Sequence, residues 1–120
     1  MTFKAFTIVV ALTAGSRLMG LDGERPDRDI SVSAAAGKVL EIDVVGFGRE
    51  PLDVSVTITD IDGNRFPLAM PFHPVPAPEG GSGRIHGPIV PERYRGFLVT
   101  VEISGVTTGT KLAQLTSGIH

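Results

Sequence analysis

The three histidines are the first side chains to examine, since imidazole serves both as a general base and as a metal ligand. They are His73, His86 and His120, and no two of them lie two or four residues apart. Histidines on one strand or helix need such a spacing to ligate one metal ion together. The histidines therefore predict no metal site, and we expect them at exposed or interface positions.

Two acidic segments have carboxylates that a hard cation would accept as ligands. Residues 60–64 (Asp-Ile-Asp-Gly-Asn) begin like a calcium loop, but the glycine comes at the fourth position and Pro71 stands where a bidentate glutamate belongs. The Asp-Gly pair predicts a hairpin turn instead. In the acidic loop 22–29, Arg25 and Arg28 are interleaved with the carboxylates. We predict no metal in either segment, and the ligand of the acidic loop, if it has one, stays open.

Two glycine-rich motifs fall short of cofactor-binding and catalytic patterns. Gly46-Phe47-Gly48 follows an apolar stretch, as in a dinucleotide fingerprint, but Pro51 replaces the third glycine and a strand follows instead of a helix. In residues 80–84, Arg84 stands where a nucleophile elbow needs its second glycine. The chain also has no cysteine, which excludes a thiolate nucleophile. We predict a protein that is not an enzyme and that uses no cofactor.

The composition indicates what kind of protein contains these motifs. With 120 residues, of which 42% are hydrophobic, the chain has the size of one domain, and we take 1–120 as a single β domain. Its 15 glycines and 9 prolines favour turns and strands over helices. A formal net charge of −2 argues against nucleic acid as a partner. The apolar run at residues 5–14 is shorter than the ~20 residues of a membrane span, so we expect no membrane partner.

Alternation of apolar and polar residues, the pattern of half-buried strands, recurs along the chain. It predicts strands at residues 5–13, 30–34, 39–45, 52–59, 64–70, 97–104 and 111–116. Asp62-Gly63 should join two of them in a type I′ hairpin, and Pro67 assigns the second of these two strands to a sheet edge. The expected fold is all-β, a sandwich or barrel of about seven to eight mostly antiparallel strands.

Residues 71–94 have no such period, and seven of the nine prolines lie between Pro67 and Pro91. Proline-rich sequences favour extended polyproline II structure. We therefore expect a long Pro/Gly-rich loop or arm that reaches over neighbouring subunits and orders on assembly. The side chains expected to contact a partner are Phe72, Val75, Arg84, Ile85, Ile89, Val90, Arg93 and Tyr94.

The first fifteen residues allow two interpretations. Lys4 followed by the apolar run has the outline of a secretory signal, which would make the protein a secreted or periplasmic binding module for carbohydrate or adhesion. No clean cleavage site follows, however, and Arg17 comes early. The alternation within residues 5–13 favours a strand that stays in the mature protein, and this is the interpretation we prefer.

Two segments are similar to parts of a known class of proteins. Residues 6–18 (Phe-Thr-Ile-Val-Val-Ala-Leu-Thr-Ala-Gly-Ser-Arg-Leu) resemble the N-terminal strand and turn of small virion proteins of tailed bacteriophages, and residues 101–110 resemble their closing strands. The resemblance implies a capsid decoration (cement) protein that binds the outside of the head shell and stabilises it, or a neck or tail accessory. It also implies a place on the virion surface, the major capsid protein or other virion subunits as partners, and a homo-oligomer, for which we assume a trimer.

Overall fold

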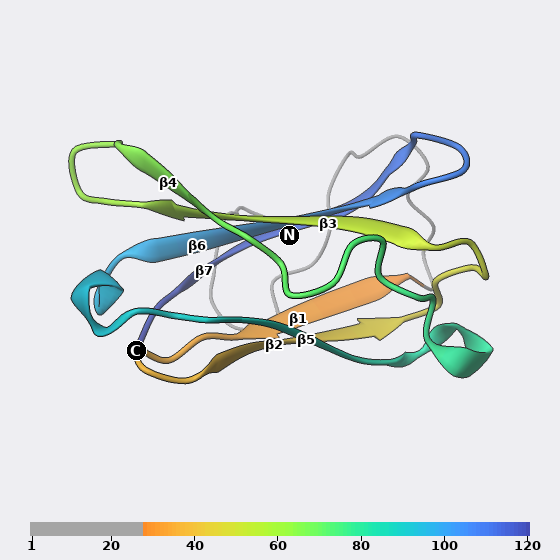
Figure 1. The fold of residues 1–120 in the computed structure, drawn as a ribbon, viewed down its shortest axis with the longest axis horizontal. Helices are drawn as coiled ribbons and strands as arrows, with labels where there is room; N and C mark the ends of the chain where they lie inside the picture. Colours follow the sequence, from red (N-terminus) through yellow and green to blue (C-terminus); the bar gives the residue numbers. More distant parts are fainter. Residues whose placement is uncertain (1–27) are drawn as a thin grey trace, which may run out of the picture.

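The computed structural model describes residues 28–120, so the strand expected at residues 5–13 lies outside the described part. The described chain forms seven strands and two short 3-10 helices (Figure 1). The strands are β1 (Asp29–Ser33), β2 (Val39–Val45), β3 (Leu52–Thr59), β4 (Arg65–Leu68), β5 (Gly83–Ile89), β6 (Leu98–Gly105) and β7 (Lys111–Gly118). The short helices are η1 (Glu79–Gly81) and η2 (Glu92–Tyr94).

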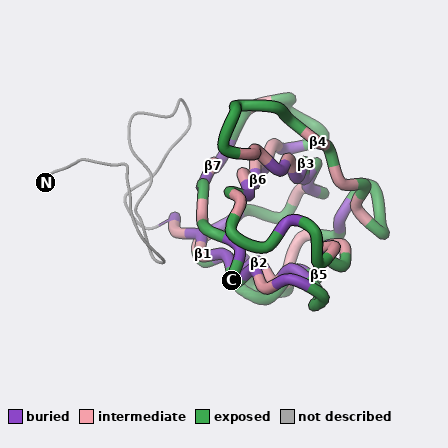
Figure 2. The backbone as a smooth tube through the Cα atoms, turned by 90° about the vertical axis from the view of Figure 1, so that its left-hand side faces the viewer, coloured by how far each residue is buried: buried purple, intermediate pink, exposed green. Residues whose placement is uncertain are grey.

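The strands form two antiparallel sheets that stack face to face (Figures 1 and 2). One sheet has the order β1-β2-β5 and the other has the order β4-β3-β6-β7. The chain crosses from one sheet to the other after β2, after β4 and after β5. The prediction of an all-β fold is confirmed, and of its two alternatives the structure is a sandwich, not a closed barrel.

Alternation along the strands builds the core between the sheets. In β3 every second side chain points inward and is buried, and these are Leu52, Val54, Val56 and Ile58. The three inward side chains of β2, Leu40, Ile42 and Val44, meet them from the opposite sheet and are almost fully buried. Burying one such side chain contributes roughly 1.5–3 kcal/mol, so the alternating segments account for most of the hydrophobic stabilisation.

The last residues of the chain tie one sheet to the other. The His120 N–H donates to the Ala34 carbonyl at 3.0 Å, and the His120 carbonyl accepts from the Ala36 N–H at 2.7 Å. Ile119, which lies between the end of β7 and His120, is buried in the core. These contacts join the end of β7 to the connection between β1 and β2.

Residues 71–94 are not the extended arm that the sequence suggested. Their central part is β5, which pairs antiparallel with β2 and places Ile85 opposite Ile42 and Arg84 opposite Asp43. The helices η1 and η2 flank this strand. The backbone hydrogen bonds that the sequence pattern did not reveal are supplied by β2, which lies about 40 residues earlier in the chain.

The hairpin between β3 and β4 is formed as predicted, with Thr59 opposite Arg65 and Gly63 at φ +85°. Its turn is not type I′, however, because the Gly63 N–H bonds the Asp60 carbonyl and the Asp60 N–H bonds the Asn64 carbonyl, each at 3.0 Å. This is a three-residue loop with glycine in the last, left-handed position. The Asp60 carboxylate selects it by accepting the Asp62 N–H at 2.9 Å and the Asn64 N–H at 2.8 Å. The pKa of Asp60 is lowered, chiefly because the Asn64 side-chain amide donates to its carboxylate.

Substituting valine for Gly63 tests the strain of this turn. A Cβ at Gly63 would meet no atom within 4 Å, so the cost arises from the positive φ alone. We expect Gly63→Val to lower the free energy of unfolding by more than ~1 kcal/mol in urea denaturation. Gly48→Val is the matched control, because Gly48 also has open space but no positive φ. Equal losses in the two variants would contradict the conformational argument.

Candidate partner-binding face

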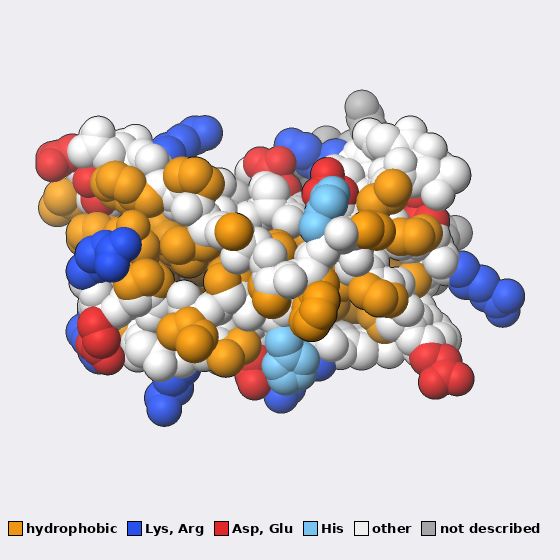
Figure 3. Space-filling model, in the orientation of Figure 1, with side chains coloured by type: hydrophobic (Ala, Val, Ile, Leu, Met, Phe, Trp, Pro, Cys, Tyr) orange, Lys and Arg blue, Asp and Glu red, His pale blue; other side chains and the backbone are white. Residues whose placement is uncertain are grey.

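One side of the sandwich is bordered by the edge strands β4 and β5, and we call it the β4–β5 face. It comprises β4, the connection at residues 69–82, β5 and the segment that continues to Phe97. In Figure 1 this face points toward the viewer, and in the same orientation Figure 3 shows hydrophobic side chains spread in a band across it. An apolar surface of this kind commonly marks a site of protein contact.

Half-buried and exposed apolar side chains both occur on this face. The half-buried ones, which pack against the core, are Phe66, Leu68, Met70 and Phe97. Two further apolar side chains are exposed: Phe72, at 71%, on the connection between β4 and β5, and Ile89, at 63%, at the end of β5 opposite Val39 of β2. Phe72 is the only exposed aromatic residue in the described part of the chain. The face therefore offers large apolar groups to a partner without opening the core.

The connection between β4 and β5 is fixed to the domain at Val75. The Leu52 N–H donates to the Val75 carbonyl at 2.7 Å, and the Val75 N–H donates to the Leu52 carbonyl at 2.8 Å. The Val75 side chain is buried. Phe72, three residues earlier, is thus presented by a segment that is anchored on both sides, by β4 and by this bridge.

Four of the eight side chains predicted to contact a partner are part of this chain's own core. Val75, Ile85, Val90 and Tyr94 are all less than a tenth exposed, so their assignment to a partner surface was wrong. Ile85 points inward from β5, and Val90 is held by backbone bonds to Gly37 at 2.6 Å and Lys38 at 2.9 Å. The Tyr94 ring lies between two phenylalanine rings, with centroid distances of 5.8 Å to Phe66 and 6.0 Å to Phe97.

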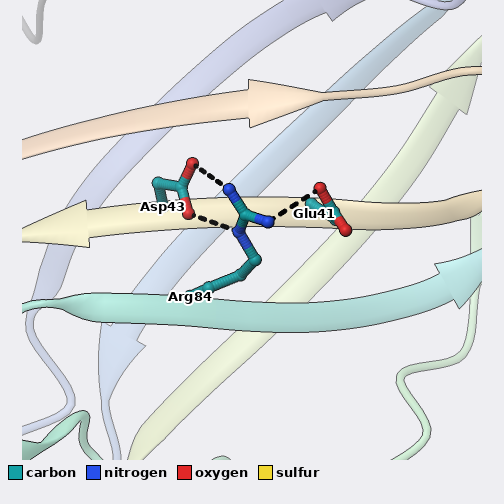
Figure 4. Close-up of polar contacts among 3 residues, drawn as sticks. All are labelled: Glu41, Asp43 and Arg84. Atoms are coloured by element: carbon teal, nitrogen blue, oxygen red, sulfur yellow. Dashed lines mark hydrogen bonds and ion pairs between the residues drawn. The ribbon is translucent and has the colours of Figure 1, made fainter.

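Arg84 is exposed, but its guanidinium is bound within the chain (Figure 4). Its Nε donates to Asp43 Oδ1 at 2.8 Å, a second nitrogen lies 3.4 Å from Asp43 Oδ2, and a third lies 3.3 Å from Glu41 Oε1. The hydrogen bond to Asp43 is the main cause that raises the pKa of Arg84. Both acids stand on β2, so Arg84 links β5 to β2 on the outer surface of the sheet. Water screens such exposed pairs, so they contribute little to the stability of the fold.

Arg93 is the remaining predicted contact residue, and it lies at the rim of the β4–β5 face. Its guanidinium carbon lies 4.7 Å from the centroid of the Tyr94 ring, which orients the charge by a cation–π contact. Beside it, Arg95 pairs with Glu92 at 2.7 Å. The apolar band thus ends in charged groups, as the rims of protein interfaces do.

The histidines show no arrangement for catalysis in the described residues. His73 Nδ1 lies 3.5 Å from an Asp53 carboxylate oxygen, with both side chains exposed, and His86 faces Glu41 across the β2–β5 pair. Within residues 28–120, no three histidine or acidic side chains gather as a metal site would require. The same part of the chain has no helix long and apolar enough to cross a membrane.

The prediction that Pro67 lies in an edge strand is confirmed, whereas the places of the later prolines were not predicted. Pro67 is in β4, Pro88 is in β5, and four more lie in the connection between these strands. Proline has no N–H donor, so the edges of this face are poor templates for another strand. A partner would therefore contact side chains here and would not extend a sheet.

Comparison of the chain with family models, with curated protein sequences and with solved structures found no match.

Proposed function

We propose that this protein is a non-enzymatic structural subunit of a virus particle, and specifically a capsid decoration protein that binds the outside of the head shell. The observation that carries the proposal is the apolar β4–β5 face, with Phe72 and Ile89 exposed on it. The resemblance of residues 6–18 and 101–110 to phage virion proteins supplies the type of particle. A folded domain with apolar side chains exposed on one face suits such a role, and this supports the proposal.

The free energy of binding a partner would come mainly from the two exposed side chains. Phe72 and Ile89 lie in segments that are anchored by the Val75 bridge and by the β2–β5 pair. A partner that covers them gains the hydrophobic free energy with little loss of backbone entropy, since the segments are already ordered. A large aromatic residue at the centre of an interface is a common hot spot, worth 2 kcal/mol or more.

The rim would add specificity. Arg93, Arg95 and Glu92 lie at one end of the face, and Arg93 is oriented by Tyr94. We expect Arg93 to meet a carboxylate of the shell protein. Arg84 is less suited to this role, because Asp43 and Glu41 already bind it.

The alternative of a carbohydrate-binding module has less support. Sugar sites use exposed aromatic platforms, but the chain has no tryptophan and its one tyrosine, Tyr94, is buried. Phe72 would have to serve as the platform, and its sequence neighbour His73 lies 3.5 Å from an Asp53 carboxylate oxygen, with both of these side chains exposed. We therefore keep the virion role as the proposal.

Removing the two apolar side chains tests the proposal. We expect Phe72→Ser combined with Ile89→Ser to leave the melting temperature within about 2 °C, because both groups are mostly solvated in the free protein. Binding to virus particles that lack the native protein should fall at least tenfold in a co-sedimentation assay.

Val106→Ser is the matched control for this experiment. Val106 is also an exposed apolar residue, but it lies after β6 on the turn to β7. It should change neither the melting temperature nor the binding. Unchanged binding of the double variant, or an equal loss in the control, would refute the role of the β4–β5 face.

A further inference from the structure

The loop between β3 and β4 contains an aspartate that is followed directly by a glycine. Asp62 and Gly63 are both exposed, and the Asp62 carboxylate makes no hydrogen bond or ion pair with the described residues. A Cβ at Gly63 would meet nothing within 4 Å, so no neighbour crowds this part of the backbone. A free aspartate before an unhindered glycine amide is the arrangement in which an aspartyl side chain reacts with its own backbone.

The reaction joins two groups that are covalent neighbours. The Gly63 amide nitrogen attacks the carboxyl carbon of Asp62 and a carbon–nitrogen bond forms, while the amide hydrogen and the hydroxyl of the protonated carboxyl group leave as water. The product is a succinimide ring. Water then opens the ring at either of its two carbonyl carbons, which returns aspartate or gives isoaspartate, in which the main chain runs through the side-chain carboxyl carbon.

The other aspartates of the described residues are less suited to this reaction. An isoleucine or valine, whose branched side chain crowds the attacking nitrogen, follows each of Asp29, Asp43, Asp53 and Asp60. The first three of these also lie in strands, where antiparallel pairing holds the backbone. Asp62 is therefore the reactive aspartate among residues 28–120.

The Asp60 side chain opposes the reaction by holding the loop closed. Its carboxylate accepts the N–H groups of Asp62 at 2.9 Å and of Asn64 at 2.8 Å, and its carbonyl accepts the Gly63 N–H at 3.0 Å. These bonds fix the peptide group between Asp62 and Gly63, so ring closure has to wait until the loop opens. The carboxylate bonds are exposed to solvent, and segments held by such bonds open locally at low free energy.

We propose that Asp62 is a site of spontaneous isomerisation to isoaspartate, and that the Asp60 carboxylate sets the rate by keeping the loop closed. Isoaspartate lengthens the main chain by one carbon atom, so the bonds that close the three-residue loop would no longer all form. Within the described residues β4 pairs with β3 alone, so loss of the turn should loosen Phe66 and Leu68 from the core. This inference does not depend on the proposed virion role, because it concerns the chemistry of the free chain.

Ageing of the whole protein tests the proposal. The parent chain and the variants Asp62→Glu, Asp60→Ala and Asp53→Ala are kept at neutral pH for weeks and then digested with trypsin, which releases residues 50–65 as one peptide. The isomerised peptide keeps the mass of the parent peptide, elutes separately and accepts a methyl group from an isoaspartyl methyltransferase. Deamidation of Asn64 would change the mass and is counted separately.

Isoaspartate should accumulate in the 50–65 peptide of the parent chain. It should be absent from Asp62→Glu, because the longer side chain would have to close a larger ring, which forms far more slowly. In Asp60→Ala, which loses both carboxylate bonds, it should form at least about fivefold faster than in the parent. Asp53→Ala is the matched control and should keep the parent rate, since Asp53 is also an exposed aspartate of this peptide but lies outside the loop, beside His73.

Three results would overturn the proposal. Isoaspartate in the 50–65 peptide of Asp62→Glu would place the reaction at another residue. Its absence from both the parent and Asp60→Ala would show that the loop does not react, and equal rates in these two proteins would show that the carboxylate does not control the loop. The other Asp-Gly pair of the chain, Asp22-Gly23, is released in a different peptide and cannot mimic any of these results.

Discussion

Replacing Gly81 with alanine is expected to lower the free energy of unfolding by about 3 kcal/mol or more. Gly81 has φ +79°, which costs an alanine roughly 1–2 kcal/mol. A Cβ there would also collide with the backbone carbonyl oxygen of Phe47. Because that oxygen belongs to the backbone, the clash cannot be relieved by rotating a side chain.

Relieving this collision would also break a hydrogen bond. The Phe47 N–H donates to the Gly81 carbonyl at 2.9 Å, so moving the two segments apart breaks this bond, worth about 1 kcal/mol. Phe47 is buried and contacts Arg28. The substitution should therefore loosen the corner where the chain leaves β2 and the turn that leads into β5.

Gly80→Ala is the control for this prediction. Gly80 has φ +74°, nearly the value of its neighbour, but a Cβ there would meet nothing within 4 Å. Urea denaturation should show a loss of about 1 kcal/mol for Gly80→Ala and a clearly larger loss for Gly81→Ala. If the free energy of unfolding falls equally in the two variants, the close approach of Gly81 to Phe47 does not affect stability.

Replacing Ile85 with alanine is the second change with a large expected effect. Ile85 is buried opposite Ile42 in the register of β5 on β2, and truncating such a side chain typically costs 2–5 kcal/mol. Ile89 in the same strand is the natural control, because it is mostly exposed. We expect Ile89→Ala to change the free energy of unfolding by less than about 0.5 kcal/mol.

This pair separates the observed strand from the extended arm suggested by the sequence. In a mobile arm both isoleucines would be solvated in the free protein, and both substitutions would be nearly neutral. Urea denaturation of the two variants, compared with the parent chain, decides between these possibilities. A neutral Ile85→Ala would contradict the pairing of β5 with β2.

The sequence was most informative where one face of a strand meets the core and the other meets water. For this reason the bounds of β2 and β3 agree with the predicted segments residue for residue. In β5 the inward positions are Ile85 and Gly87, and a Cβ on Gly87 would lie within 3.4 Å of Leu40. Glycine at this position leaves room for Leu40. The apolar alternation that would have indicated a strand is therefore missing.

The type of the turn after β3 and the exposed residues of the β4–β5 face could not be predicted from the sequence, for different reasons. Asp-Gly signals a hairpin, but the choice of a three-residue loop depends on the Asp60 carboxylate, which accepts two backbone N–H groups. The burial of Val75 depends on its bridge to Leu52, a contact between distant segments. Of the predicted contact residues, Phe72, Arg84, Ile89 and Arg93 remain on the surface, and nothing local distinguishes them from the four that are buried.

The order of the strands has a consequence for how the chain acquires its fold. The centre of the larger sheet pairs β3 with β6, and between them the chain makes β4, crosses to β5 and returns. The backbone edge of β3 that pairs with β6 therefore has no partner until β6 has been synthesised. Pairings between such distant segments place sandwiches among the slower-folding domains, with times of milliseconds to seconds. During translation, this edge of β3 has no partner strand while the chain beyond it is made.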